Sequence, residues 1–319
     1  MLKKAPGKGA ASGALRHFID LDDFDARTLR RIVDMAHAMK RAGKRPPPDL
    51  KPKNIEDAIL VMIFEKPSTR TRVSFDVAMR QLGGQTIALN HTDLQTGRGE
   101  PVSDTAKVLS RYADAIMLRA NKHDTLRELA DNASIPVING LTEKSHPCQI
   151  IADIMTLEEH KGPVTGAKVA WVGDGNNVAA SWIHAAVRLG FKLRIACPPQ
   201  LNPDTSLLDW AKREGGDIEL TDDADAAVSG VDCIVTDTWV SMGQTDATRR
   251  KQLLAPYAVG DGLMKKAAKG AVFMHCLPAY RGLEVSASVI DGPQSVVFDE
   301  AENRLHAQKA ILAWCLGVD

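Results

Sequence analysis

Short apolar runs alternate with helix-compatible segments along most of this 319-residue chain. Such alternation is typical of parallel β-sheets that carry helices on both faces. The expected strands are Ala58 to Phe64, Ala115 to Leu118, Ile135 to Ile138, 168–172, 193–196, 232–236, 271–274 and 295–298. The expected helices include one with Leu29, Ile32, Val33, Ala36 and Met39 on a single face, one that opens at Val73, and segments over 125–132, 149–160, 178–189, 206–214, 222–229 and 246–254. The pattern therefore predicts an α/β fold with doubly wound parallel sheets.

The length of the chain favours two domains. A single hydrophobic core rarely grows beyond roughly 250–300 residues, and a second series of strands begins at Lys168, after a helix-compatible segment that ends in Lys161-Gly162-Pro163. We therefore expect two doubly wound domains with a cleft between them, preceded by a flexible tail over residues 1–15. A transit peptide is the alternative for this tail, because it is basic and carries no acid, although Pro6, Gly7 and Gly9 disfavour an amphipathic helix.

Composition excludes several classes of partner. Forty basic and forty acidic residues cancel, so the net charge offers no field for nucleic acid or an anionic membrane surface. No apolar run approaches the ~20 residues that a membrane span needs. The five cysteines lack the spacing of a metal site or a redox pair, which indicates free thiols, a reducing compartment such as the cytoplasm, and no bound metal. They are Cys148, Cys197, Cys233, Cys276 and Cys315.

The turn after the first expected strand has the composition of an anion-binding site. Phe64 ends the strand, and Ser68-Thr69-Arg70-Thr71-Arg72 opens the next helix. Free N–H groups of a first helical turn favour an anion, and a guanidinium fork matches phosphate oxygens. Two residues are about 200° apart around a helix, so we assign Arg70 to the anion and Arg72 to an ion pair within the protein. The alternative is an ordinary capped helix with a solvated basic turn.

Polar residues also follow the later strands, where open parallel sheets bind their ligands. Each has a structural explanation when it is taken alone: an ion pair for Arg119, a turn before proline for His146, a packed thiol for Cys276, and helix caps for Asn176 and Asn177. Several such segments at several strand ends favour a binding site. They are Arg119, Asn139-Gly140, His146-Pro147-Cys148-Gln149, Gly173-Asp174-Gly175-Asn176-Asn177, Asp237 to Gly243, and Met274 to Pro278.

A dinucleotide-binding redox enzyme is an alternative that the sequence disfavours. Gly173-x-Gly175-x-x-Val178 follows a strand as a dinucleotide fingerprint does, but its third small residue is replaced by Val178. In addition, no acidic residue follows the next strand to bind a ribose hydroxyl.

Four of these segments together resemble the aspartate/ornithine transcarbamylase family, and within it the ornithine-specific members. Ser68 to Arg72 resembles the carbamoyl phosphate signature, His146 to Gln149 the second such motif, Asp237 with Ser241-Met242-Gly243 the ornithine loop, and His275-Cys276-Leu277-Pro278 the cysteine segment. The resemblance runs from about Arg16 to the C-terminus. It implies a carbamoyl phosphate-binding domain over 16–148 that helix 301–319 completes, an ornithine-binding domain over 149–300, and a homotrimer, or a multiple of trimers, with shared sites.

The resemblance also implies a role for each matched residue. Carbamoyl phosphate would be bound by Ser68, Thr69, Arg70, Thr71, Arg119, His146, Gln149 and Arg304, with Gln95 from a neighbouring subunit. Ornithine would be bound by Asn177, Asp237, Ser241, Met242, Cys276 and Leu277. Arg119, His146, Asp237 and Cys276 would be catalytic, in a reaction that forms citrulline and phosphate without a cofactor and with carbamoyl phosphate bound first. A transcarbamylase for putrescine or an acylated ornithine, and a catalytically silent binding protein, are the alternatives.

Overall fold

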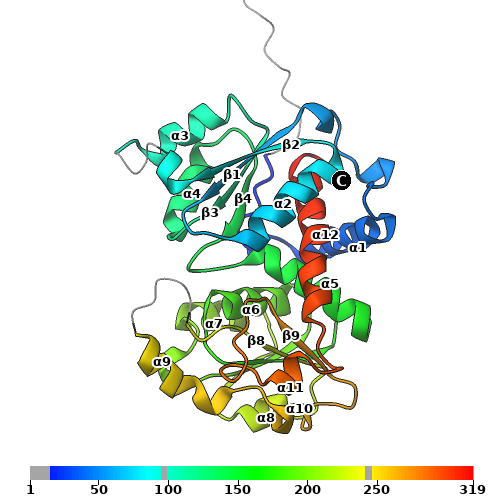
Figure 1. Cartoon of the computed structure of the whole chain (residues 1–319), viewed down its shortest axis with the longest axis vertical. Helices are drawn as coiled ribbons and strands as arrows, with labels where there is room; N and C mark the ends of the chain where they lie inside the picture. Colours follow the sequence, from blue (N-terminus) through cyan, green and yellow to red (C-terminus); the bar gives the residue numbers. More distant parts are fainter. Residues whose placement is uncertain (1–14, 95–98, 241–245, 319) are drawn as a thin grey trace, which may run out of the picture.

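The computed structural model describes residues 15–94, 99–240 and 246–318. Two α/β lobes lie one above the other in Figure 1. One holds a four-stranded parallel sheet in the order β2-β1-β3-β4, and the other a five-stranded parallel sheet in the order β7-β6-β5-β8-β9. The prediction of two doubly wound parallel sheets is confirmed. The strands are β1 Ile59–Phe64, β2 Gln85–Asn90, β3 Ala115–Arg119, β4 Val137–Leu141, β5 Lys168–Val172, β6 Lys192–Ala196, β7 Ile218–Thr221, β8 Cys233–Thr236 and β9 Val272–His275.

The helices pack on the sheets and between the lobes (Figure 1). They are α1 Ala26–Ala42, α2 Thr69–Leu82, α3 Val102–Leu109, α4 His123–Asn132, α5 Pro147–Lys161, α6 Asn177–Leu189, α7 Thr205–Arg213, α8 Ala224–Val228, α9 Ala247–Leu254, α10 Asp261–Met264, α11 Ala287–Ile290 and α12 Val297–Cys315. Short 3₁₀ turns cover Pro48–Leu50, Ile55–Asp57, His91–Asp93, Pro199–Leu201 and Ala255–Tyr257. None of the helices in these described ranges combines the length and the apolarity needed to cross a bilayer.

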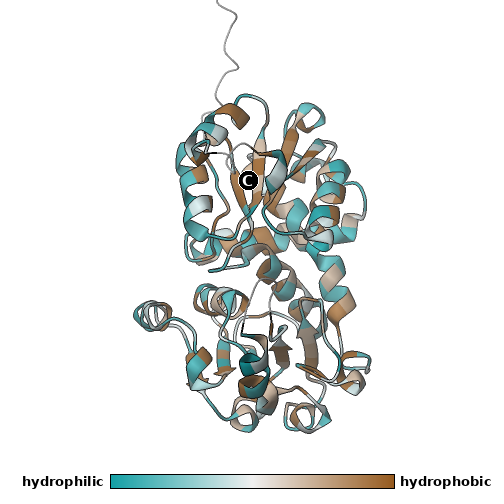
Figure 2. Cartoon of the chain, turned by 60° about the vertical axis from the view of Figure 1, so that its left-hand side comes forward, coloured by the Kyte–Doolittle hydropathy of each residue, from teal (hydrophilic) through white to brown (hydrophobic). Residues whose placement is uncertain are grey.

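Burial explains why these segments form strands and helices. The central strands β1, β5 and β8 are buried along nearly their whole length, as strands of a sheet covered on both faces must be. Figure 2 shows mainly hydrophobic strands inside both lobes, and around them helices that carry both hydrophilic and hydrophobic residues. On α1 the predicted apolar face is buried as expected, while the side chain of Asp25 caps the helix by accepting from the backbone N–H of Thr28.

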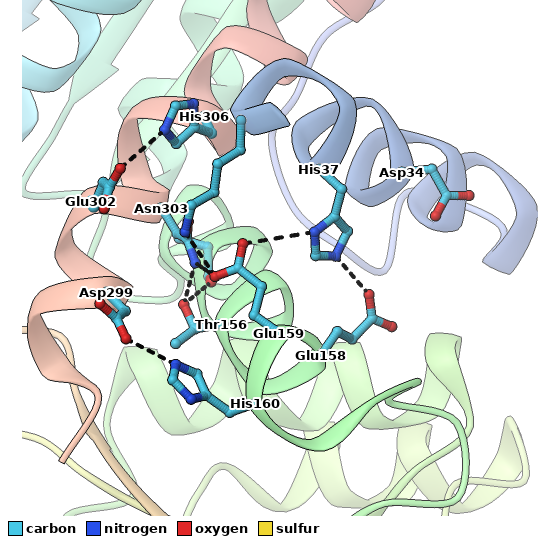
Figure 3. A network of polar contacts seen from close by, with 12 residues as sticks. Asp34, His37, Thr156, Glu158, Glu159, His160, Asp299, Glu302, Asn303 and His306 are labelled. Carbon is cyan, nitrogen blue, oxygen red and sulfur yellow. Dashed lines mark hydrogen bonds and ion pairs between the residues drawn. The ribbon is translucent and has the colours of Figure 1, made fainter. Parts of the chain in front are cut away.

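Helices α5 and α12 join the two lobes. Helix α12 begins beside β9 of the second sheet and ends against α1 and α2 of the first lobe (Figure 1). Figure 3 shows the polar contacts where α12 lies against α5 and α1: Asn303 Nδ2 donates to Thr156 Oγ1 over 2.9 Å, and the imidazole of His37 lies 3.0 Å from the carboxylate of Glu158. A residue on either helix can therefore contact groups from both lobes.

Some element predictions are wrong. Residues 295–298 were expected as a strand, but only Ser295 bridges to Phe273, and α12 starts at Val297. A short apolar run does not distinguish a buried strand from a buried helix, and the acidic first turn of α12 suits a helix N-terminus. The edge strands β2 and β7 were not expected, because their side chains are largely exposed or half-buried rather than continuously apolar.

Candidate active site

The predicted polar segments lie where the order of each sheet reverses. In the first sheet the chain moves outward from β1 to β2 and then in the opposite direction through β3 and β4, so the reversal lies between β1 and β3. In the second sheet the reversal lies between β5 and β8. Open α/β sheets bind ligands at such points, outside the carboxyl ends of the strands. The fold therefore places Thr71 and Arg119 at one reversal point, and Asn176 and Asp237 at the other.

A cluster of guanidinium groups surrounds Thr71. Arg119 Nη1 and Arg304 Nη2 both donate to Thr71 Oγ1, over 3.3 and 2.8 Å. Burial, together with the positive charges of Arg304 and Arg70, lowers the pKa of Arg119 to about 10. Burial also lowers the pKa of Arg304, again with a contribution from Arg70. Among the described residues, none of these three arginines forms an ion pair with a carboxylate, and the Nε atoms of Arg119 and Arg304 are buried without a hydrogen-bond partner.

Arg304 is buried and Arg119 is half-buried, and like charges placed this close together without an anion are unfavourable where little water screens them. The cluster is stabilised when an anion with several acceptor oxygens binds. Ser68 occupies the N-cap of α2, but its side chain makes no capping hydrogen bond. This favours an anion-binding site over an ordinary helix cap. Thr69 and Arg70 are exposed beside it. The structure thus brings together Ser68, Thr69, Arg70, Thr71, Arg119 and Arg304.

The predicted ion pair of Arg72 is not formed with any carboxylate in the described part of the chain. Arg72 is exposed, and its neighbour Asp76 instead pairs with Arg80, over 3.0 Å. Asp76 and Arg80 are one helical turn apart, which is the spacing at which opposite charges meet on a helix surface.

His146 is the N-cap of α5, and Gln149 lies on the first turn of this helix. The backbone N–H of His146 donates to Ser181 Oγ over 2.8 Å, which ties α5 to α6. Burial lowers the pKa of His146 well below its ordinary value, and the charges of Arg304 and Arg119 lower it further. The imidazole is therefore neutral at pH 7. Its Nδ1 atom and the Oε1 atom of Gln149 are both buried without a partner.

Asp237 is held in place by three donors. Its Oδ1 accepts from the backbone N–H of Thr238 over 2.7 Å and from Cys276 Sγ over 3.2 Å, and its Oδ2 accepts from Asn176 Nδ2 over 2.8 Å. Burial and the carboxylate of Asp237 raise the pKa of Cys276 well above its ordinary value. Cys276 is therefore a protonated thiol that donates to Asp237, which favours a packing and positioning role over that of a base.

The two asparagines after β5 have different contacts. Asn176 caps α6, because its Oδ1 accepts from the backbone N–H groups of Val178 and Ala179. Asn177 Nδ2 donates to the carbonyl of Thr142 in the first lobe over 2.8 Å, which leaves one of its two amide protons for a ligand. The residues predicted to bind ornithine include Asn177 but not Asn176. Its contact with Asp237 depends on the pairing of β5 with β8 and had no signal in the sequence.

A buried ion pair that the sequence did not indicate supports the segment after β8. Arg250 on α9 donates to Asp174 Oδ2 and, over 3.0 Å, to the carbonyl of Trp239. Leu277, half-buried after β9, donates its N–H to His275 Nδ1 over 2.9 Å. The predicted site residues Gln95, Ser241 and Met242 lie outside the described residues.

Two groups in the described part of the chain have donor atoms close enough to hold a metal ion. Asp237, His275 and Cys276 form one group, and Asp20, Asp22 and His184 form the other, each with its donor atoms within 4.8 Å of one another. Several of these atoms are already hydrogen-bonded within the protein: Cys276 donates to Asp237, His275 accepts from the backbone N–H of Leu277, and His184 bonds to Asp20.

Comparison with known proteins gives matches over nearly the whole chain. The family model described as aspartate/ornithine carbamoyltransferase, carbamoyl-P binding domain, matches residues 16–159, and the corresponding Asp/Orn binding domain matches residues 165–315. An ornithine carbamoyltransferase of Rhodopseudomonas palustris is 58% identical over 308 residues, which are 96% of this chain and 99% of that protein. One of Nitrobacter winogradskyi is 60% identical over 306 residues, with coverage of 96% and 99%.

Solved structures agree with these matches. The ornithine carbamoyltransferase of Pyrococcus furiosus is 48% identical with a TM-score of 0.88, and the alignment covers 95% of this chain and 98% of that one. The anabolic ornithine carbamoyltransferase of Campylobacter jejuni is 39% identical with a TM-score of 0.88, and the coverage is 94% and 99%.

Proposed function

Because the chain belongs to the aspartate/ornithine carbamoyltransferase family, we propose that it transfers the carbamoyl group of carbamoyl phosphate to the δ-amine of L-ornithine. The products are L-citrulline and phosphate. The observation that carries this proposal is the cluster of Arg70, Arg119 and Arg304 around Thr71, whose charges no described carboxylate neutralises.

The phosphate group of carbamoyl phosphate fits the guanidinium cluster. Ser68, Thr69 and Thr71 supply hydroxyl groups, the first turn of α2 supplies N–H groups, and the arginines supply charge-assisted donors. Arg119 lies between this phosphate site and the carbamoyl oxygen. The neutral imidazole of His146 donates to the same oxygen, and the unpartnered Oε1 of Gln149 accepts from the carbamoyl NH₂ group.

The amino-acid side favours ornithine over other amines. The carboxylate of Asp237, fixed by Asn176 and Cys276, suits the α-ammonium group, and the remaining amide proton of Asn177 suits the α-carboxylate. Putrescine has no α-amino acid group, and acylation of the α-amine removes its positive charge. L-Aspartate would place a second carboxylate close to Asp237, which costs free energy through repulsion of like charges.

The reaction is a displacement at an activated carbonyl. The neutral δ-amine attacks the carbamoyl carbon, negative charge develops on the carbonyl oxygen, and the C–O bond to phosphate then breaks. Donors that Arg119, Thr71 and His146 aim at that oxygen stabilise the transition state. Because an alkyl ammonium group has a pKa of about 10.4, ornithine must first release one proton to solvent to give the neutral δ-amine. The attacking nitrogen loses a second proton as the C–N bond forms, and the departing phosphate accepts it.

We propose that carbamoyl phosphate binds first. The free site is cationic, so it repels the positively charged side chain of ornithine until the dianion neutralises Arg70, Arg119 and Arg304. Calorimetry with and without the stable mimic phosphonoacetamide tests the order. Ornithine should bind measurably only in its presence, and equal affinity under both conditions would contradict ordered binding.

We also propose a homotrimer, or a multiple of trimers, acting in arginine biosynthesis in the cytoplasm. The oligomer is supported by the exposed edge strand β2, whose Ile87 is solvent-exposed just before the segment that contains Gln95. The compartment is supported by five free thiols. Mixing a Gln95→Ala chain with an Arg304→Met chain tests shared sites, because mixed trimers regain sites in which both residues are intact.

A panel of acceptors tests the function itself. The chain is incubated with carbamoyl phosphate and L-ornithine, L-aspartate, putrescine or N-acetylornithine, and the ureido product and phosphate are measured. We expect ornithine to be the only one of the four acceptors that gives a ureido product, in an amount equal to the phosphate released. Phosphate release without a ureido product, or transfer to aspartate in preference to ornithine, would overturn the proposal.

A further inference from the structure

The side-chain amide of Gln149 is held only at its nitrogen end. Its Nε2 donates to Asp153 Oδ1 over 2.8 Å and to Glu300 Oε1 over 3.1 Å. Its Oε1 is buried and has no partner among the described residues. Both protons of the amide nitrogen are therefore used, whereas the acceptor oxygen is left for a ligand.

The two acids that hold Gln149 form a buried pair. Asp153 lies one turn after Gln149 on α5, Glu300 lies on the first turn of α12, and each is 1% exposed. Their carboxyl groups are hydrogen-bonded to each other. Two buried carboxylates in contact cannot both ionise without strong repulsion, so the pair keeps at least one proton. Burial raises the pKa of Asp153 to about 7 and raises that of Glu300 well above its ordinary value.

The pair fixes the orientation of the amide. In the observed arrangement an acceptor oxygen of each acid faces a proton on Gln149 Nε2. If the amide turned over, its own oxygen would face two carboxyl oxygens and its NH₂ group would face the ligand. Burial makes such an unpaired contact costly.

We propose that Asp153 and Glu300 are positioning residues that set the acyl-group specificity of the site. By holding Gln149 Oε1 toward the ligand, they make the site favour a carbamoyl group, whose NH₂ donates to that oxygen, over an acetyl group of nearly the same shape. This inference rests on the proposed carbamoyl phosphate site and adds residues from α5 and α12 that do not contact the substrate themselves.

Counting acceptors shows how the two acids differ. Both oxygens of Glu300 accept from N–H donors, Oε1 from Gln149 and Oε2 from the backbone of His275 over 2.8 Å. Asp153 accepts from Gln149 through Oδ1 alone. Asp153→Asn therefore keeps an oxygen for Gln149 and supplies an N–H to Glu300. Glu300→Gln must point an NH₂ group at a donor, and because the backbone N–H of His275 is fixed, the side chain of Gln149 has to turn.

The test compares two stable ligands that differ in one group. Phosphonoacetamide carries the NH₂ group, and 2-oxopropylphosphonate carries a methyl group in its place. Calorimetry gives the ratio of their dissociation constants for the wild-type chain and for the Asp153→Asn, Glu300→Gln and Thr156→Ala variants. Thr156→Ala is the matched control, because Thr156 is equally buried on α5 and also bonds to α12, through Asn303, but does not contact Gln149.

We expect the wild-type chain to prefer phosphonoacetamide, and Glu300→Gln to reduce this preference by roughly tenfold, the value of one lost hydrogen bond. Asp153→Asn and Thr156→Ala should leave the ratio within about threefold of the wild-type value. An unchanged ratio in Glu300→Gln, or an equal loss in the Thr156→Ala control, would overturn the inference. Failure of the wild-type chain to bind phosphonoacetamide at all would instead overturn the proposed function.

Discussion

At the scale of single residues, the site is built from groups that are unfavourable without a ligand. The half-buried Arg119 and the buried Arg304 lie close to each other and to Arg70, and they share the hydroxyl of Thr71 rather than an acid. Their mutual repulsion reduces the stability of the free protein and is offset when a phosphate dianion binds. Function and stability are therefore expected to oppose each other at these positions.

Replacement of Arg119 by methionine separates its effect on catalysis from its effect on stability. Loss of one preorganised donor to the carbamoyl oxygen should lower kcat by about a hundredfold, or ~3 kcal/mol. Because a half-buried charge near Arg304 is removed, the free energy of unfolding should stay equal or rise. Steady-state kinetics and urea unfolding measure both quantities. Arg127→Met is the control, since Arg127 pairs with Asp23 at the surface; unchanged turnover in Arg119→Met would remove that residue from the mechanism.

At the scale of elements, the start of α6 has two tasks. Asn176 ends the loop after β5, caps the helix through its Oδ1 and holds Asp237 after β8 through its Nδ2. The cap contributes to stability, whereas the contact with Asp237 holds the carboxylate that we propose binds the α-ammonium group of ornithine. The side chain of Asn176 thus links the start of α6 to the segment after β8, which lies nearby because β5 pairs with β8.

Asn176→Ala should affect both tasks. Loss of the cap should cost about 1 kcal/mol of stability, and the freed carboxylate of Asp237 should raise KM for ornithine by roughly tenfold. The affinity for phosphonoacetamide should not change, because the guanidinium cluster lies on the other lobe. Asp204→Ala removes the cap of α7 in the same way but does not contact the site. It should lose stability with KM unchanged, and an equal rise of KM in both variants would contradict the assignment.

At the scale of the whole molecule, α5 and α12 carry ionisable groups between the lobes. Asp153 faces Glu300 and Gln149, and the charges of Arg304 and Asp237 also act on it. Its pKa in the folded chain is about 7 against an ordinary value of 3.8. Between these values the folded chain keeps a proton that the unfolded chain has released. This stabilising contribution is present at low pH and is lost as the pH rises to 7.

The stability difference between the wild-type chain and Asp153→Asn should therefore depend on pH. Relative to the variant, the wild-type chain should lose about 1.4 kcal/mol of unfolding free energy per pH unit between about pH 4 and pH 7. Urea unfolding at several pH values measures the difference. Thr156→Ala removes a neighbouring hydrogen bond between α5 and α12 but no titrating group, so its effect should be constant, and a constant effect of Asp153→Asn would contradict a protonated pair.

What the sequence determined by itself is the alternation of elements and the chemistry of the segments after the strands. Continuously apolar strands such as β1, the apolar face of α1, and the hydroxyl and guanidinium groups of Ser68 to Arg72 can be recognised locally, because burial and helix geometry impose fixed periods on the chain. The sequence does not predict the edge strands β2 and β7, because their side chains are exposed or half-buried. An apolar run fits either a strand or a helix, so the sequence predicts a strand over 295–298, where α12 begins.

The tertiary structure decided which of these groups meet. Arg304 reaches Thr71, Asn176 reaches Asp237, and Glu300 reaches Gln149 and Asp153 because α12 returns from the second lobe to the first and because β5 pairs with β8. These partners are far apart in sequence, so no local period links them. Their protonation states depend on burial and on charges brought together by folding, and this is why a neutral His146, a protonated Cys276 and a shared proton on α5 and α12 follow only from the folded chain.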